Sequence, residues 1–139
     1  MASDPNCIFC KIVAGQIPST KLFEDAETLA FMDINPANDG HCLVIPKTHA
    51  ATLFDISADD VAATIRTAQR VACALAAALA PDGLNLVQSN GPGAAQSVPH
   101  LHFHILPRRM GDGLLINWAL KPGDMQRIAE VAALIRAKL

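Results

Sequence analysis

The feature that most constrains the fold is a seven-residue stretch, residues 100–106, in which histidines alternate with apolar side chains. Successive side chains of a β-strand point to opposite faces of a sheet. We therefore predict a strand on which His100, His102 and His104 share one face, at intervals of about 6.6 Å, while the apolar residues between them enter a core. A solvent-facing polar strand is the alternative. It fits less well, because three of the five histidines lie in this one stretch.

Short apolar segments elsewhere predict the rest of a sheet. Each is rich in Leu, Val, Ile or Phe and is bounded by Gly, Pro, Asn or Asp residues. The predicted strands are 21–24, 28–32, 41–45, 84–89 and 98–106. Most connections are short, so the predicted fold class is α+β. We expect a five-stranded antiparallel sheet with helices on one side, in a single domain that spans residues 1–139.

Two longer segments predict helices. Ser57 and Asp60 resemble a capping signal, and Pro81 ends the segment that follows them. The apolar positions expected on its inner face are Val61, Ile65, Ala68, Ala72, Leu75 and Leu79. The second helix is predicted over residues 124–138. Its expected inner face is Ile128, Val131, Leu134 and Ile135.

Composition limits the classes of function. The formal charge of −2 is spread along the chain, so no basic stripe suits a polynucleotide. The first residues lack the basic and apolar regions of a secretory signal, and no apolar stretch is long enough to cross a membrane. We expect a soluble cytoplasmic protein that binds a small molecule. Cys42 and Cys73 lie in apolar segments and are expected in the core, whereas Cys7 and Cys10 form a CxxC pair.

The loop before the histidine stretch, residues 89–97, is made mostly of small residues. Its backbone N–H groups could wrap phosphate oxygens, and Gln96 and Ser97 would add neutral donors. A plain connection between strands is the alternative. The position of the loop beside the histidines favours phosphate binding.

Residues 100–106 resemble the signature of the histidine triad (HIT) family, in which three histidines alternate with apolar residues. The resemblance runs in order from residue 7 to about residue 109. The other residues that carry it are Cys7 to Lys11, Phe31 to Pro36, His41, Leu43 to Lys47, His49, Asn90, Gly91, Gln96 and Ser97. It implies the HIT-like fold and a homodimer in which two sheets join into one.

The resemblance also implies roles for single residues. His102 would attack the α-phosphate of a nucleotide, and His104 and His41 would flank that phosphate. Asp33 would accept hydrogen bonds from the ribose, although a turn aspartate is the simpler alternative. The other predicted nucleotide-binding residues are Asn90, Gln96 and Ser97 at the phosphate and Ile8, Phe9, Leu29 and Phe31 around the base. A neutral imidazole can attack without a separate strong base, and no metal is needed for this chemistry.

One branch of the family has zinc ligands at the positions of Cys7, Cys10, His49 and His100. Two thiolates and two imidazoles suit a tetrahedral structural zinc. A redox-active CxxC pair is the rival interpretation, but its surroundings do not resemble the strand-to-helix setting of such thiols.

Three residues depart from the family pattern or fall outside it. Ala95 stands where the family usually has Gly, so a left-handed backbone there would be strained. Pro99 lacks an N–H group, which predicts a sheet edge or a local bulge. Trp118 lies in the segment from 111 to 121, where it could reach a ligand or a partner subunit, or could simply pack.

The leading hypothesis is a hydrolase that acts on a purine nucleoside 5′-monophosphate joined to an amine. Dinucleoside polyphosphate hydrolases and nucleotidyltransferases occur in the same family, although an intact His104 argues against the transferase branch. A nucleotide-binding module with little turnover is the alternative of another class.

Overall fold

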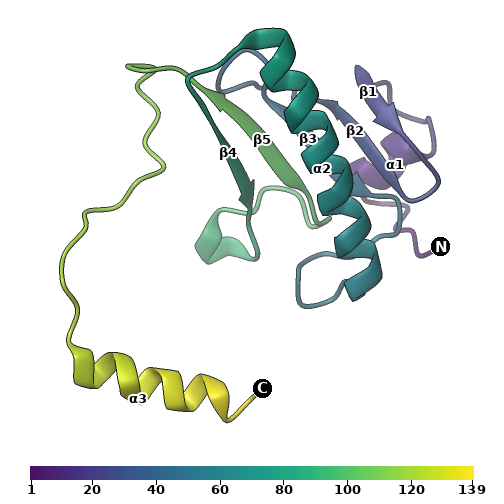
Figure 1. Ribbon diagram of the computed structural model, residues 1–139. Helices are drawn as coiled ribbons and strands as arrows, with labels where there is room; N and C mark the ends of the chain where they lie inside the picture. Colours follow the sequence, from purple (N-terminus) through teal and green to yellow (C-terminus); the bar gives the residue numbers. More distant parts are fainter.

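The sheet that the sequence predicts is present. The computed structural model describes residues 1–139, and its five strands are antiparallel in the order β1-β2-β3-β5-β4 (Figure 1). The elements are α1 (Ile8–Val13), β1 (Lys21–Glu24), β2 (Thr28–Met32), β3 (Cys42–Pro46), α2 (Ala58–Leu79), β4 (Gly83–Gln88), a 3-10 turn (Pro92–Ala94), β5 (Phe103–Arg108) and α3 (Met125–Arg136). The α+β class is thus confirmed, but α1 was not predicted, because six residues are too few to show a helical period.

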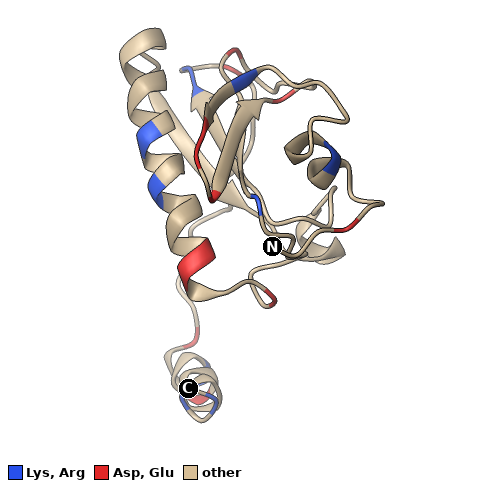
Figure 2. Ribbon diagram, turned by 90° about the vertical axis from the view of Figure 1, so that its right-hand side faces the viewer, with Lys and Arg blue, Asp and Glu red and all other residues tan.

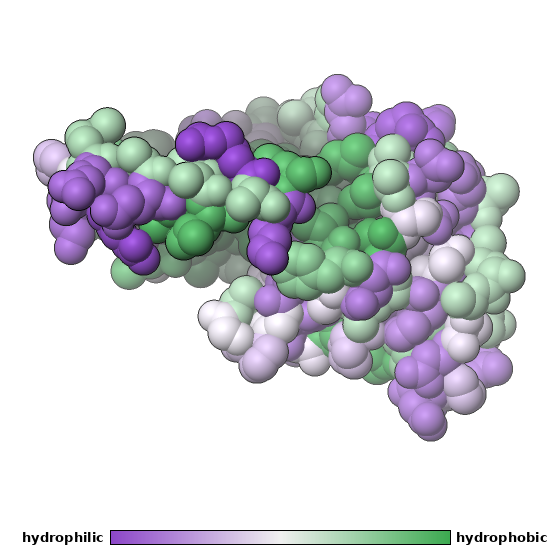
Figure 3. All heavy atoms as spheres, turned by 90° about the horizontal axis from the view of Figure 1, so that it is seen from below, coloured by the Kyte–Doolittle hydropathy of each residue, from purple (hydrophilic) through white to green (hydrophobic).

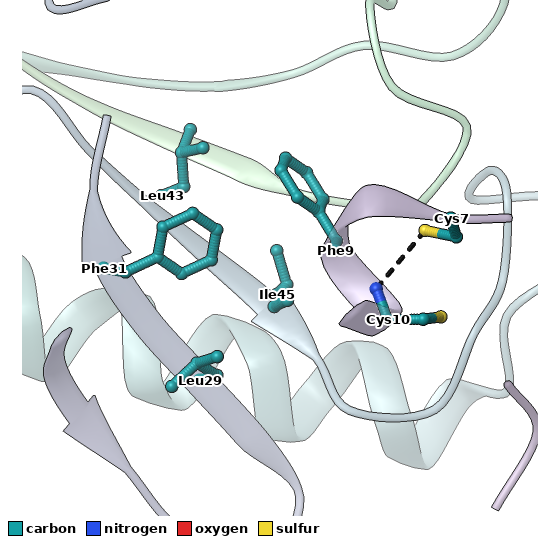
Figure 4. Packing of buried hydrophobic residues seen from close by; sticks show 7 residues of the cluster. All are labelled: Cys7, Phe9, Cys10, Leu29, Phe31, Leu43 and Ile45. Carbon is teal, nitrogen blue, oxygen red and sulfur yellow. Dashed lines mark hydrogen bonds between the residues drawn. The ribbon is translucent and has the colours of Figure 1, made fainter. Parts of the chain in front are cut away.

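Side-chain alternation divides the core into two layers, one on each face of the sheet. On one face, Phe9 of α1 packs with β2 and β3 residues such as Phe31 and Leu43 (Figure 4). On the other face, α2 covers residues such as Val44 and Ile105. The prediction of helices on one side is therefore wrong, since α1 and α2 lie on opposite faces.

Helix α2 begins as its sequence predicts, and it buries only part of the predicted inner face, with Ala68 and Leu75 buried as expected. The Ser57 hydroxyl accepts a hydrogen bond from the Asp60 N–H at 3.1 Å. The predicted inward residues Ile65 and Leu79 are 39% and 40% exposed, while two threonines are buried. Hydroxyl groups explain the difference, because the side chain of buried Thr67 hydrogen-bonds that of Thr28 at 2.7 Å. A pattern that counts only apolar residues misses such a face.

Of the two cysteines expected in the core, one is buried and the other is exposed. Cys42 is fully buried beneath α2, as predicted, but Cys73 on α2 is exposed. The expectation for Cys73 was wrong because it points away from the sheet, on the solvent side of the helix.

Strand β5 begins later than predicted. It starts at Phe103, so His100 and His102 precede it instead of lying within it. Pro99 has no N–H to donate, and the backbone N–H of Leu101 donates outside the ladder, to the Ala50 carbonyl at 2.7 Å. The sheet edge or bulge expected at Pro99 is absent, because Pro99 lies before the strand and pairs with no neighbour. The backbone around the first two histidines is thus free for other contacts.

The C-terminal segment leaves the body of the protein as an extended arm that ends in α3 (Figure 1). Asp124 caps α3, because its carboxylate accepts hydrogen bonds from the N–H groups of Gln126 and Arg127. The predicted inner face is wrong, since Ile128, Leu134 and Ile135 are 50–64% exposed and no α3 residue is buried. None of the helices combines the length and apolar character needed to cross a bilayer.

Candidate active site

A cavity of about 450 Å³ opens on the face of the sheet that carries α1. Its inner wall is largely apolar, and its polar groups are gathered around the ends of β2 and β5. The predicted site residues that line it are Ile8, Phe9, Phe31, Asp33, His41, Ser97, His102 and His104. Asn90, Gln96 and Leu29 do not line it. The lining residues that were not predicted as site residues are Ile12, Ile17, Pro18, Ser19, Met32, Ile34, Asn35, Leu43 and Val98.

Leu43 could have been found from the sequence, because alternate residues of a strand share a face, which places Leu43 on the same face as His41 and Ile45. Residues 17–19 carried no such signal. They lie before β1 and reach the cavity only through the fold.

The imidazole of His102 is held by the backbone two residues earlier. Its Nδ1 lies 2.7 Å from the carbonyl oxygen of His100, which can only accept, so Nδ1 carries the proton. Nε2 is then left with its lone pair and has no hydrogen-bond partner in the protein. Phe9 packs edge-on against the imidazole at 5.3 Å between ring centroids. Burial lowers the pKa of His102, so the neutral form is favoured at neutral pH.

Hydrogen bonds also fix which ring nitrogen carries the proton in His41 and in His104. The backbone N–H of Ala37 donates to His41 Nδ1 at 3.0 Å, so the proton of a neutral His41 is on Nε2. That Nε2–H donates to His104 Nδ1 at 2.9 Å. The proton of a neutral His104 is therefore on Nε2. Burial, reinforced by the neighbouring His102 and His41, lowers the pKa of His104 to about 4.

Asp33 forms the expected aspartate turn, and its predicted role at a ribose stays a prediction. One carboxylate oxygen accepts a hydrogen bond from the Asn35 N–H at 2.8 Å, as in an aspartate turn. The other oxygen lies 3.4 Å from His41 Nε2 and lines the cavity. One residue thus shapes the turn and presents an acceptor to the cavity.

Asp33, His41 and His104 lie close enough together to suggest a metal site. The proton positions disfavour it. A metal at His41 Nε2 would require the proton on Nδ1, where it would face the Ala37 N–H. The trio is better suited to hydrogen bonding with a substrate.

A second cluster lies on the far side of His102. Cys7 and Cys10 come from the start of α1, His49 follows β3, and His100 precedes β5. His100 Nδ1 lies 3.4 Å from Cys7 Sγ, 3.6 Å from Cys10 Sγ and 3.2 Å from His49 Nδ1. These separations between ligand atoms are close to those around a tetrahedral zinc ion with bonds of about 2.0 to 2.3 Å. The four residues therefore fit zinc.

The surroundings of this cluster also suit a metal. The Pro46 carbonyl lies 2.8 Å from His100 Nε2 and so holds the proton there, which leaves Nδ1 free toward the cysteines. Cys7 Sγ accepts a hydrogen bond from the Cys10 N–H at the start of α1 (Figure 4). Burial raises the pKa of the Cys7 thiol, and a bound cation would oppose that effect by stabilising the thiolate.

The loop that was expected to wrap phosphate uses most of its polar groups internally. The Gln96 side chain accepts from the Gly91 N–H and donates to the Ala51 and Val98 carbonyls. The side-chain oxygen Oδ1 of Asn90 accepts a hydrogen bond from the Leu53 N–H at 2.7 Å. Ser97 is the predicted phosphate-binding residue of this loop that does line the cavity.

Ala95 has a φ of 59° and is left-handed, which is the conformation in which an alanine at this position is strained. It is exposed and does not line the cavity. Its methyl group therefore does not narrow the cavity in this structure.

Comparison with known proteins decides the family. A model of the HIT domain matches residues 14–111. The chain belongs to the HIT family. It is 40% identical over 137 residues to adenosine 5′-monophosphoramidase HNT1 of Saccharomyces cerevisiae, covering 98% of this chain and 84% of that protein. The predicted resemblance is thus confirmed.

Solved structures of HIT proteins share the fold. The crystal structure of SMU.412c from Streptococcus mutans is 39% identical, covers 99% of this chain and 87% of that one, and has a TM-score of 0.94. A zinc-bound histidine triad protein from Mycobacterium smegmatis is 38% identical, with 95% and 97% coverage and a TM-score of 0.75.

Proposed function

We propose that this HIT protein is an enzyme that hydrolyses the bond between the α-phosphate of a nucleoside 5′-monophosphate and an amine, with His102 as the nucleophile. The observation that carries the proposal is the fixed tautomer of His102. Its Nδ1–H is held by the His100 carbonyl, so its Nε2 lone pair is available at the cavity, beside His104 and close to Asp33. The similarity to a yeast adenosine 5′-monophosphoramidase supports the choice of leaving group.

The cavity has room and chemistry for a nucleoside monophosphate. Its apolar wall, with Ile8, Phe9 and Phe31, suits a flat base, and the free oxygen of Asp33 suits the ribose hydroxyls. The phosphate then lies at the histidines and Ser97. Lys and Arg residues are interspersed with Asp and Glu over the elements (Figure 2), a distribution that favours a small nucleotide over a polynucleotide.

The chemistry proceeds in two displacements. His102 Nε2 forms a bond to the α-phosphorus while the P–N bond breaks, and the leaving nitrogen takes the bonding pair and one proton from a solvent water. That proton is returned to the solvent in the second displacement. The Nδ1–H donated to the His100 carbonyl stabilises the positive charge that the phosphorylated imidazole acquires. Water then attacks the nucleotidyl-histidine, releases one proton, and leaves the nucleotide and a neutral His102.

His104 contributes a fixed donor to both steps. Because its Nδ1 accepts from His41, its Nε2–H is the group left to donate to a phosphoryl oxygen as negative charge develops there. His41 is a positioning residue in this scheme, since it acts through His104.

We also propose that Cys7, Cys10, His49 and His100 hold a structural zinc ion. The converging ligand atoms and the zinc-bound relative support it. Bound there, zinc supplies a cross-link between α1 and the segment that carries His102, and it takes no part in the reaction. Thiolate ligands of this kind fit a reducing compartment such as the cytoplasm.

A homodimer is the expected assembly. Strand β4 is an edge of the sheet, and its Leu86 side chain is 43% exposed. An unprotected edge of this kind is suited to pairing with the same strand of a second copy, which would join the two sheets.

The test compares wild type with His102→Ala in buffers treated to remove free divalent metal. Adenosine 5′-phosphoramidate, a diadenosine polyphosphate and a nucleotide sugar are the substrates. We expect the phosphoramidate to be hydrolysed, with kcat at least about 10⁴-fold lower in His102→Ala, in which AMP binding and zinc content are unchanged. AMP binding by the wild type without turnover of any substrate would overturn the proposal in favour of a binding module.

A further inference from the structure

One polar side chain of the cavity takes no part in the proposed reaction. On the outer face drawn in Figure 3, hydrophilic and hydrophobic residues are mixed, so a lone polar group there indicates no ligand. The cavity wall is largely apolar by contrast, and Ser19 lines it. The Ser19 hydroxyl has no hydrogen-bond partner in the protein, and it is not buried away from the cavity. A bound molecule can therefore supply the partner.

The backbone places Ser19 beside Asp33. The Met32 N–H donates to the Thr20 carbonyl at 2.9 Å, just beyond the pairing of β1 with β2. When this antiparallel register is continued by one residue, Ser19 lies opposite Asp33. Residues directly opposite each other in antiparallel strands point to the same face, with Cα atoms about 4.5 to 5.5 Å apart. Both residues line the cavity, which agrees with this placement.

Ser19 is the last member of a row of polar side chains that crosses the sheet. His104 Nδ1 accepts a hydrogen bond from His41 at 2.9 Å, and a carboxylate oxygen of Asp33 lies 3.4 Å from the same nitrogen of His41. The Asp33 N–H donates to the His41 carbonyl at 3.1 Å, so these two residues are also neighbours across strands. Adjacent strands are about 4.8 Å apart. Ser19 is therefore about one strand spacing farther from the histidines than Asp33.

The order of side chains in this row matches the order of groups in a nucleoside 5′-monophosphate. In the proposed function, the phosphate lies at the histidines and the ribose lies at Asp33. Of the two ribose hydroxyl groups, the 2′-hydroxyl is farther along the sugar from the 5′-phosphate, next to the carbon that carries the base. A side chain one strand beyond Asp33 is therefore beside the 2′-hydroxyl. The hydroxyl of Ser19 can donate to that group or accept from it.

We propose that Ser19 is a specificity-determining residue whose hydroxyl hydrogen-bonds the 2′-hydroxyl of the bound nucleotide. The inference rests on the proposed function, which puts the ribose at Asp33. A 2′-deoxyribonucleotide displaces water from the Ser19 hydroxyl without replacing the hydrogen bonds that the water made. An unpaired polar group in a largely apolar cavity is unfavourable, so Ser19 contributes to selection of ribonucleotides.

Equilibrium binding of three nucleotides tests the inference without measuring hydrolysis. AMP, 2′-deoxy-AMP and 3′-deoxy-AMP are titrated by calorimetry into the full-length wild type, Ser19→Ala and Thr20→Ala. Thr20→Ala is the matched control, because Thr20 is the next residue of the same segment but is exposed and does not line the cavity. Thermal unfolding of each variant measures whether the substitution changes the stability of the fold.

Ser19→Ala should raise the Kd of AMP and of 3′-deoxy-AMP about fivefold, because both nucleotides keep the 2′-hydroxyl. The Kd of 2′-deoxy-AMP should change less than about twofold, since the hydrogen bond is already missing. Thr20→Ala should leave all three Kd values as they are in the wild type.

Two results would overturn the inference. An equal rise in Kd for all three nucleotides would mean that Ser19 acts on Asp33 or on the base, and an unchanged Kd for AMP would mean that its hydroxyl meets no ligand. Absence of AMP binding to the wild type would overturn this inference and the proposed function together. AMP binding without turnover would contradict the proposed function alone, and the three Kd values would still decide the role of Ser19.

Discussion

Two clusters of histidines lie within a few residues of each other, and they differ in what their rings can do. In the cluster of Cys7, Cys10, His49 and His100, the Nε2–H of His100 donates a hydrogen bond to the Pro46 carbonyl. Nδ1 of His100 therefore faces the two sulfur atoms and the His49 imidazole. In the cluster of His41, His102 and His104 at the cavity, the Nδ1–H of His102 donates a hydrogen bond to the His100 carbonyl. Its Nε2 lone pair is therefore the one that can reach a ligand. The backbone partner of one ring nitrogen therefore decides the chemistry of the other.

Enclosure is the other difference. His100 is fully buried and is one of four side chains whose ligand atoms converge, a closed arrangement typical of structural metal sites. His102 and His104 open onto the cavity, where a ligand can reach them. If this contrast is correct, changes in one cluster should affect stability and changes in the other should affect turnover.

The largest effect is expected from Cys10→Ser. A missing thiolate leaves three ligands, so zinc should fall well below one ion per chain and Tm should fall by about 10 °C, since structural zinc contributes directly to folding. Metal analysis and thermal unfolding measure both quantities. Cys73→Ser is the matched control, because Cys73 is exposed and outside the cluster. Unchanged zinc content and Tm in Cys10→Ser would contradict the zinc assignment.

His41→Ala should lower turnover with little effect on zinc or Tm. Without the Nε2–H of His41, neither nitrogen of His104 is fixed as the donor. We expect kcat to fall by about 10²-fold, the usual size for loss of an orienting partner, with KM nearly unchanged. His41→Gln carries an amide N–H that can reach His104 and should restore part of kcat. Equal loss in both variants would argue against a positioning role.

Acid should destabilise the cavity cluster through His104. The pKa of His104 is lowered by burial to about 4 in the folded protein, against an ordinary value near 6.5. Between these values the unfolded state binds more protons, so stability falls as pH falls from about 6.5 toward 4. Because His104 is partly exposed, we expect the unfolding free energy to fall by about 2 kcal/mol over this range.

Urea unfolding of wild type and His104→Asn at pH 7 and pH 4.5 measures this contribution. The difference in unfolding free energy between the two proteins should shift by about 2 kcal/mol in favour of the variant at the lower pH. Acid effects on other groups are common to both proteins. A difference that is independent of pH would show that His104 titrates normally.

The sequence predicted the sheet and the gathering of the site residues better than it predicted the exposure of helices. Strand alternation and chain order place Asp33, His41 and His102 around one cavity, and both are visible in the sequence. The inner face of α2 was misjudged because buried Thr67 satisfies its hydroxyl by pairing with Thr28, a contact between distant residues.

The hydrogen-bond partners of the polar side chains near the site could not be predicted from the sequence either. Gln96 was expected at the phosphate because of its position, yet its side chain bridges the Gly91 N–H and the Ala51 carbonyl. The α3 helix was correctly predicted as a helix with a cap. Its inner face was wrong because amphipathicity indicates that a helix needs an apolar neighbour and does not indicate which molecule supplies it.

The smallest expected effect comes from Ala95→Gly, which separates backbone strain from catalysis. Ala95 and Ala80 are both left-handed, with φ of 59° and 44°, but only Ala95 lies in the loop beside the cavity. Glycine removes the Cβ atom that strains a left-handed residue, but it also gives the unfolded chain more conformational freedom, which offsets part of the gain. Ala95→Gly and its matched control Ala80→Gly should therefore each gain about 0.5 to 1 kcal/mol in unfolding free energy. Since the Ala95 side chain does not line the cavity, kcat and KM of Ala95→Gly should stay as close to wild type as those of Ala80→Gly. A changed KM in Ala95→Gly alone would mean that the loop moves onto the nucleotide when it binds, and that the phosphate contacts expected of this loop form only then.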